Sequence, residues 1–122
     1  IGADFYNRVK AAHTVVQTGE PRLYANVILR KAARVMTATT RLYIMETYWD
    51  RQRFENAAFC LQQTSLYFTC MANGNSQMYH SSVLHQCIER AGLVVAEEVD
   101  GVGISHTVTQ VVKPVQAPAC AA

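Results

Sequence analysis

The feature that most constrains this fold is the alternation of strand-like and helix-like segments along the chain. Four short segments have the apolar, aromatic or β-branched composition of strands: 3–6, 41–47, 93–99 and 104–112. Three longer segments carry apolar residues at helical spacing: 18–36, 51–72 and 81–91. Such alternation predicts a layered α/β fold, in which helices lie on the faces of a sheet.

The ends of the predicted helices are marked by residues with known local preferences. Asp50 is expected to cap the long helix 51–72, and Ser81 or Ser82 the helix that follows it. Gly92 is placed to stop that last helix. The residues expected to face inward from the first helix are Leu23, Val27, Ile28, Ala32 and Val35.

The last two strands are expected to form an antiparallel pair at the edge of the sheet. A glycine-rich turn at 100–103 would join them. From Lys113 the chain continues with prolines among alanines, which is typical of a tail. The sequence therefore predicts one α/β domain over 1–112 and a Pro/Ala-rich tail over 113–122.

Charge and hydropathy exclude two classes of partner. Eleven Lys and Arg residues against nine Asp and Glu leave a net charge of only +2, and the basic residues are scattered. Electrostatic binding of nucleic acid needs a denser basic surface, so no such partner is expected. No run of 18 apolar residues is present, and no membrane partner is expected either.

The cysteines and histidines show no metal-binding pattern. There is no CxxC pair, and His80 and His85 are five residues apart, so they do not share a helical face. Cys60, Cys70 and Cys87 fall within helical patterns, where a small buried thiol is the ordinary interpretation. Reduced structural cysteines, a cytoplasmic location and no metal are therefore expected.

Two stretches give the chain a resemblance to a known family. Residues 41–81, RLYIMETYWDRQRFENAAFCLQQTSLYFTCMANGNSQMYHS, form a strand that ends in Glu46, then Thr-Tyr-Trp-Asp and a long helix. Residues 89–112, ERAGLVVAEEVDGVGISHTVTQVV, form a helix end and two closing strands. In both, the chain resembles the C-terminal half of a class I (Rossmann-like) S-adenosylmethionine-dependent O-methyltransferase. The resemblance implies a partial methyltransferase sheet and methyl transfer to a hydroxyl of a small acceptor, including an aromatic one.

The same resemblance suggests a catalytic base. Many O-methyltransferases carry a histidine after the fourth strand that accepts the proton of the acceptor hydroxyl, and His13 can be aligned with it. Imidazole suits this task because its ordinary pKa is near neutrality. Thr14 follows His13 where the family often has Asp, so a non-catalytic loop histidine is an equal alternative.

Candidate acceptor-binding residues lie beyond the second strand and around the turn after the long helix. Open α/β sheets bind ligands at the carboxyl ends of their strands. The candidates are Tyr48, Trp49, Asp50, Asn73, Asn75 and Tyr79. A helix entry packed by Trp49 and capped by Asp50 is the structural alternative, and the two asparagines also suit a turn.

No segment of this sequence matches the family's cofactor site. That site starts with a strand, a glycine-rich loop and a helix, followed by an acidic residue for the ribose. S-adenosylmethionine is therefore implied by resemblance only, and the chain alone is expected to bind it weakly or not at all. Two alternatives remain open. Either an N-terminal half completes the enzyme, or the chain is a non-catalytic domain that self-associates or binds a partner.

Overall fold

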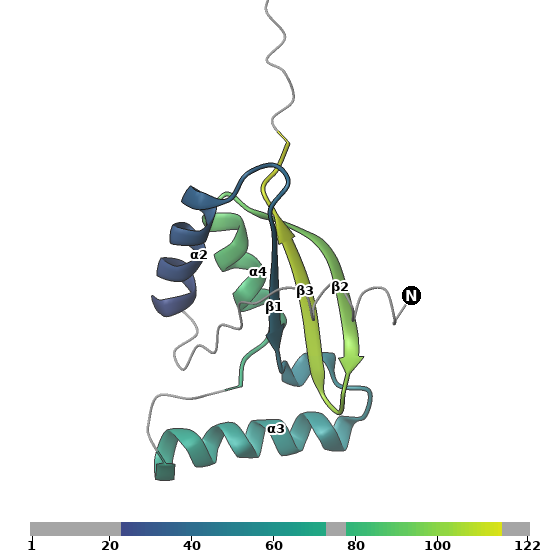
Figure 1. Ribbon diagram of the computed structural model, residues 1–122. Coiled ribbons are helices and arrows are strands. Elements are labelled where there is room, and N and C mark those ends of the chain that lie inside the picture. The colour runs from purple at the N-terminus through teal and green to yellow at the C-terminus, as the bar shows by residue number, and fades with distance from the viewer. Residues whose placement is uncertain (1–22, 73–77, 116–122) are drawn as a thin grey trace, which may run out of the picture.

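The computed structural model describes residues 23–72 and 78–115 (Figure 1). In chain order its elements are α2 (Leu23–Val35), β1 (Arg41–Glu46), the 3-10 turn η1 (Trp49–Arg51), α3 (Glu55–Tyr67), the π-helical turn η2 (Phe68–Ala72), α4 (Ser81–Arg90), β2 (Val94–Val102) and β3 (His106–Val112). The predicted α/β class is confirmed. The strand expected at 3–6 and the start of the first helix lie outside the described residues.

The sheet has three described strands in the order β1-β3-β2, and β3 is antiparallel to both neighbours. Gln110 of β3 is paired with Tyr43 on one side and with Glu97 on the other. The antiparallel pairing of the last two strands is confirmed, and the final strand lies between the other two. Because both outer strands oppose β3, β1 and β2 run in the same direction, and their carboxyl ends meet at one edge of the sheet.

Strand β3 is the most buried element of the sheet. Five consecutive residues of it, from Thr107 to Val111, are buried. Consecutive strand residues point to opposite faces, so this strand is covered on both. The side-chain amide of Gln110 donates to the Tyr43 hydroxyl at 2.5 Å, which satisfies a polar group on one face. Val111 joins the main core on the other face.

The main core lies between the sheet and a layer formed by α2 and α4, which lie side by side in Figure 1. Its buried members are Leu29, Met36, Tyr48, Tyr79, Leu84, Cys87, Ile88, Leu93 and Val111. Three of them, Leu84, Cys87 and Ile88, repeat at helical spacing on α4. The apolar face predicted for this helix is thus confirmed.

The inward face predicted for the first helix is wrong in part. Val27 and Val35 are 47% and 81% exposed, whereas Leu29 is buried. The buried stripe runs through Leu29, Ala32, Ala33 and Met36, which also repeat at helical spacing. The helix has apolar residues on two sides, and contact with α4 decides which side is buried.

The long helix predicted over 51–72 begins later than expected. The chain first makes the turn η1, and α3 starts at Glu55 after Phe54, whose side chain makes no capping bond. The predicted capping role of Asp50 for this helix is therefore wrong. Its carboxylate instead accepts hydrogen bonds from Ser81 at the start of α4, so a tertiary contact replaces the local one. In Figure 1, α3 lies across the end of the sheet that holds the β2–β3 turn.

The ends of α4 match the predicted positions, although a different residue caps it. His80 is the N-cap, and its side chain accepts a hydrogen bond from the backbone N–H of Ser82, so neither predicted serine is the cap. At the other end Gly92 adopts φ = +74°, and its N–H donates to the Glu89 carbonyl at 2.9 Å. The predicted helix stop is confirmed.

The hairpin turn is displaced from its predicted position. Strand β2 continues through Gly101 to Val102, and the turn is formed by residues 103–105 rather than 100–103. Gly101 and Gly103 both have positive φ, and the pairing is irregular between Val99 and Val102. The glycines therefore accommodate a bulged strand end as well as the turn.

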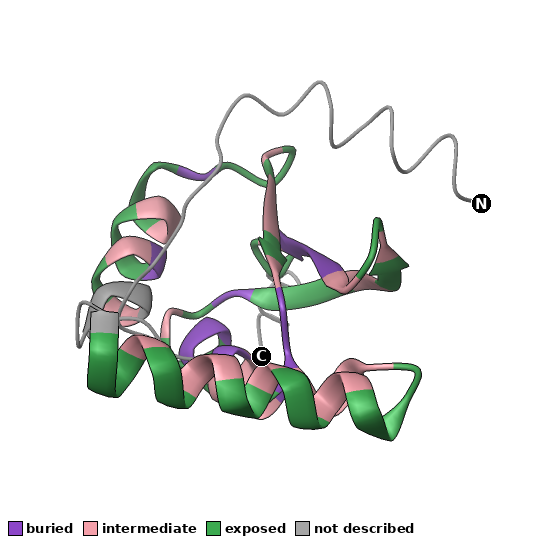
Figure 2. Cartoon of the chain, turned by 90° about the horizontal axis from the view of Figure 1, so that it is seen from below, coloured by how far each residue is buried: buried purple, intermediate pink, exposed green. Residues whose placement is uncertain are grey.

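Two of the three cysteines in the described residues are not buried. Cys87 lies in the core as expected, but Cys60 and Cys70 are exposed on α3 and η2. The expectation of buried thiols is wrong for these two: α3 has no buried residue, and Cys70 lies in an exposed part of η2. Figure 2 shows the exposed surface running along this helix.

Replacing Gly92 with alanine tests the helix stop. A Cβ at this position meets no atom within 4 Å, so the cost comes from the left-handed backbone alone. We expect Gly92→Ala to lower the free energy of unfolding by about 1–2 kcal/mol, measured by chemical denaturation. Gly92→Asn is the matched control, because asparagine tolerates this conformation better than alanine. Its free energy of unfolding should fall clearly less. Equal losses for the two variants would contradict this explanation.

Candidate functional site

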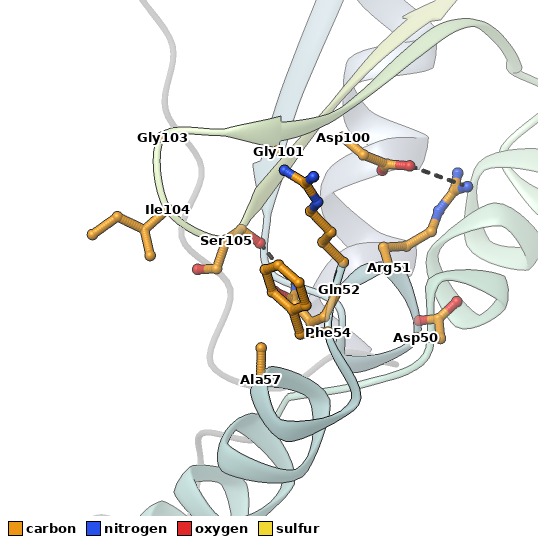
Figure 3. Close-up of a pocket in the computed structure, with 11 residues that line it drawn as sticks. Asp50, Arg51, Gln52, Phe54, Ala57, Asp100, Gly101, Gly103, Ile104 and Ser105 are labelled. Carbon is orange, nitrogen blue, oxygen red and sulfur yellow. Dashed lines mark hydrogen bonds and ion pairs between the residues drawn. The ribbon is translucent and has the colours of Figure 1, made fainter.

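A surface pocket of about 710 Å³ lies at the edge where β1 and β2 end (Figure 3). One wall is formed by the segment after β1, and the other by the end of β2 and the hairpin turn. The lining residues are Asp50, Arg51, Gln52, Arg53, Phe54 and Ala57 on the first wall, and Asp100, Gly101, Gly103, Ile104 and Ser105 on the second. This is the edge at which open α/β sheets bind ligands.

Arg51 joins the two walls through a pair of carboxylates. Its guanidinium forms an ion pair with Glu98 and a second one with Asp100, at 3.6 Å between Nη1 and Oδ2. Glu98 is also held from α4 and β3. Its Oε1 is 2.8 Å from His85 Nε2 and accepts a hydrogen bond of 2.8 Å from the Thr109 hydroxyl. One carboxylate therefore ties together η1, α4, β2 and β3.

These contacts set the protonation state of Glu98. Burial acts to raise its pKa, but the hydrogen bonds from His85 and Thr109 and the charges of His85 and Arg51 outweigh burial. The net result is a pKa below the ordinary value of 4.5. Glu98 is therefore charged at neutral pH and acts as an acceptor of hydrogen bonds, not as a proton donor.

Asp50 makes a second tie, from η1 to the start of α4. Its two carboxylate oxygens accept from the Ser81 backbone N–H at 2.8 Å and from the Ser81 hydroxyl at 2.6 Å. Burial acts to raise its pKa, but these hydrogen bonds outweigh burial and lower it. His80 Nε2 lies 3.5 Å from the same carboxylate, and its ring packs edge-to-face on Trp49.

Just beyond the end of β1, the side chain of Tyr48 is buried against the ring of Tyr79. Tyr79 donates a hydrogen bond of 3.2 Å to Glu46 Oε2, and Tyr79 and Tyr48 pack edge-to-face with centroids 5.7 Å apart. Burial, then the neighbouring Tyr79, Glu46 and Glu98, raise the pKa of the Tyr48 hydroxyl far above its ordinary value. Tyr48 is thus a neutral core residue in this structure.

Gln52 connects the pocket walls directly. Its side-chain amide donates to the Tyr48 carbonyl at 2.6 Å and to the Ser105 carbonyl at 3.1 Å, and Figure 3 shows the second contact. The hairpin turn is thereby fixed against the segment that follows β1. The spacing of the two walls is set by a side chain in addition to the sheet.

The structure separates the predicted site residues into three groups. Tyr48 and Tyr79 lie in the core, with exposed fractions of 0% and 8%. Asp50 lines the pocket at the sheet edge, and Trp49 and Asp50 both line a neighbouring pocket of about 480 Å³ beside α3. His13, Asn73 and Asn75 lie outside the described residues. The functional role of all six acceptor-site candidates and of His13 stays a prediction.

The sequence analysis did not identify most of the residues that shape this edge. Arg51, Arg53 and Phe54 follow the strand end within a few residues, so the rule about carboxyl ends of strands could have included them. Glu97 and Glu98 are adjacent in β2 and point to opposite faces, and they pair with Gln110 and Thr109 respectively. No local signal showed that Glu98 would meet His85 and Arg51.

Residues 23–72 and 78–115 contain no group of three His, Cys, Asp or Glu side chains placed to hold a metal ion. None of their helices combines the length and apolar character that crossing a bilayer requires.

The shape of the fold is shared with a solved enzyme. The mitomycin 7-O-methyltransferase MmcR matches this chain with a TM-score of 0.56 and 18% sequence identity. The match covers 73% of this chain and 24% of that one. The fold is methyltransferase-like. At this identity the likeness establishes the fold alone, and the chain spans about a quarter of that enzyme's length.

Sequence comparisons add little to this methyltransferase-like fold. The model of the RbsD / FucU transport protein family matches residues 2–34, which are 33 of the 122 residues. Most of that segment lies outside the described part of the chain, and the match is too short to assign the chain to the family. None of the curated proteins matches the sequence.

Replacing Glu98 with glutamine tests the central ion-pair cluster. The variant keeps the size of the side chain but leaves Arg51 and His85 without their shared charge. We expect a loss of about 1–2 kcal/mol in the free energy of unfolding at neutral pH. Glu89→Gln, at an exposed position on α4, is the control and should be nearly neutral.

The pH dependence of this difference has a defined sign. Because folding lowers the pKa of Glu98, its contribution is present above pH 4.5 and is lost as pH falls through the folded pKa. The gap between the wild type and Glu98→Gln should therefore shrink between about pH 5 and about pH 3 in denaturation experiments. A gap that stays constant over this range would contradict the assigned charge state.

Proposed function

We propose that this chain forms the acceptor-binding part of a methyltransferase that methylates a hydroxyl group of a small molecule. The single observation that supports the proposal most strongly is the position of β3. It lies reversed between two strands of equal direction, in a fold shared with a solved O-methyltransferase. A pocket at the carboxyl edge of this sheet adds a place for the acceptor.

The carboxylates at the sheet edge are a poor fit for the ribose of S-adenosylmethionine, because each is already engaged within the protein. Asp50 bonds Ser81, Glu98 bonds Arg51, and Asp100 accepts from Thr107 at 2.9 Å. The glycines of the hairpin turn are followed by β3 and not by a helix N-terminus. The proposal therefore assigns the cofactor to residues other than these, in a larger protein.

Positioning is the contribution that these residues would make to methyl transfer. The reaction requires an acceptor oxygen held in line with the methyl group and a group that takes its proton. Asp50, which lines this pocket, and Trp49, which lines the neighbouring pocket beside α3, would orient the acceptor. In this proposal His13 is the base, on the strength of the family resemblance.

Calorimetry and a methylation assay test the proposal together. The complete reading frame that contains this sequence should transfer labelled methyl groups from S-adenosylmethionine to small phenols. The 122-residue chain alone should bind S-adenosylmethionine more weakly than the micromolar range.

A variant series separates the base from structural effects. In the complete protein, His13→Ala should lower kcat by about 10²-fold or more, and His106→Ala is the control, because that histidine starts β3. Micromolar binding of S-adenosylmethionine to the isolated chain would contradict the assignment of the cofactor to other residues. A complete reading frame without methyl transfer would contradict the proposed activity.

One observation favours a second function, self-association of a non-catalytic domain. Helix α3 has no buried residue and holds a single charged residue, Glu55. Its partly buried residues lie on one side, while Phe59 and Leu66, on the other side, are 60% and 58% exposed. A helix with apolar residues on both sides is normally covered on both. A second copy of the chain would cover the outer side.

Sedimentation velocity tests this second function. If α3 mediates self-association, the wild-type chain sediments as a dimer, and Leu66→Glu shifts it to the monomer because a charge enters the apolar contact. Gln63→Glu on the same helix face is the control for charge alone and should shift the equilibrium less. A monomer at every protein concentration would contradict self-association.

A further inference from the structure

Of the two arginines that line the pocket at the sheet edge, one is paired with carboxylates and the other is not. Asp50 bonds Ser81, and Arg51 is paired with Glu98 and Asp100. Arg53, also in the lining, is exposed and contacts no carboxylate among the described residues. The guanidinium of Arg53 is therefore available to pair with an anion.

An aromatic ring lies directly beside that charge. The guanidinium carbon of Arg53 is 5.3 Å from the centroid of the Phe54 ring. Phe54 is 65% exposed, although its backbone is anchored, since its carbonyl accepts from the N–H groups of Ala57 and Ala58 at 3.0 and 3.2 Å. An exposed phenyl ring on an anchored backbone, beside a cation, forms a surface for a planar ring that carries an anion.

The opposite wall leaves room for such a ligand. Gly101 and Gly103 have no side chains, and a Cβ at either position would meet no atom within 4 Å. Ile104, between them and Ser105, is fully exposed and adds an apolar surface. A pocket of about 710 Å³ falls in the range that holds small organic ligands.

We propose that this pocket binds an aromatic carboxylate, whose carboxylate pairs with the Arg53 guanidinium and whose ring packs on Phe54. The inference rests on the proposed function in one respect: the ligand is taken to be the hydroxyl-bearing methyl acceptor. A hydroxybenzoate-like compound combines the three groups that the proposal requires, namely a carboxylate, an aromatic ring and a hydroxyl. Asp100, which lines the same pocket, is held by Arg51 at 3.6 Å and by a hydrogen bond from Thr107.

Two ligands that differ only in charge provide the test. 4-Hydroxybenzoate and its neutral amide, 4-hydroxybenzamide, have nearly the same size and ring. Binding is followed on the 122-residue chain by calorimetry and by the fluorescence of Trp49, the single tryptophan, which lies next to the pocket residue Asp50. We expect the acid to bind about tenfold more tightly than the amide, as one charge-assisted contact allows.

Variants assign the two contacts. Arg53→Gln should reduce binding of the acid to the level of the amide, and Arg53→Lys should retain part of the preference. Phe54→Leu should lower the affinity for the acid and for the amide to the same extent. Arg41→Gln is the control, because Arg41 starts β1 at the opposite edge of the sheet, and it should leave both affinities unchanged.

Several results would overturn the inference. These are equal affinity for acid and amide, no binding of either, or an acid preference that survives Arg53→Gln. No methyl donor is present, so the outcome is independent of the proposed activity. Binding of the acid with no methylation by the complete protein would refute the activity and leave the carboxylate site standing. Methylation by the complete protein that does not depend on Arg53 would refute the carboxylate site and leave the activity standing.

Discussion

The pairing of β3 with both of its neighbours is the constraint on which the rest of this structure depends. The strand is buried on both faces: its residues from Thr107 to Val111 are all buried, and Val111 belongs to the main core. Antiparallel pairing on both sides forces β1 and β2 into the same direction. Their carboxyl ends therefore lie together, and the segments that follow them meet across one pocket.

Polar contacts convert that meeting of strand ends into a fixed site. Arg51 reaches Glu98 and Asp100 of β2, Asp50 reaches the start of α4, and Gln52 reaches the hairpin turn. Three consecutive residues thus contact three different elements. Such a segment has little freedom to rearrange, because each side chain is held by a different part of the fold. Preorganisation of this kind is what a binding site needs when its ligand must be oriented.

The sequence was informative wherever a local pattern decided the structure. Helix α4 and its stop at Gly92 were predicted because spacing and glycine chemistry act over a few residues. The methyltransferase-like α/β layout was also predicted, in part by family resemblance. The buried side of α2 was misassigned because that helix has two apolar stripes, and only contact with α4 distinguishes them.

The missed features all depend on residues far apart in the chain. Asp50 meets Ser81 across 31 residues, and Arg51 meets Glu98 across 47. No spacing rule predicts such pairs before the topology is known. The pocket was located only approximately for the same reason, since its second wall is a hairpin turn that a bulge displaces from 100–103 to 103–105.

Nuclear Overhauser contacts of Gln110 test the central claim most directly. If β3 lies between the outer strands, the backbone protons of Gln110 show cross-strand contacts to both Tyr43 and Glu97. The account predicts both sets in the same spectrum of the folded chain. Contacts from Gln110 to one strand only, or direct contacts between Tyr43 and Glu97, would place β3 at an edge and contradict the account.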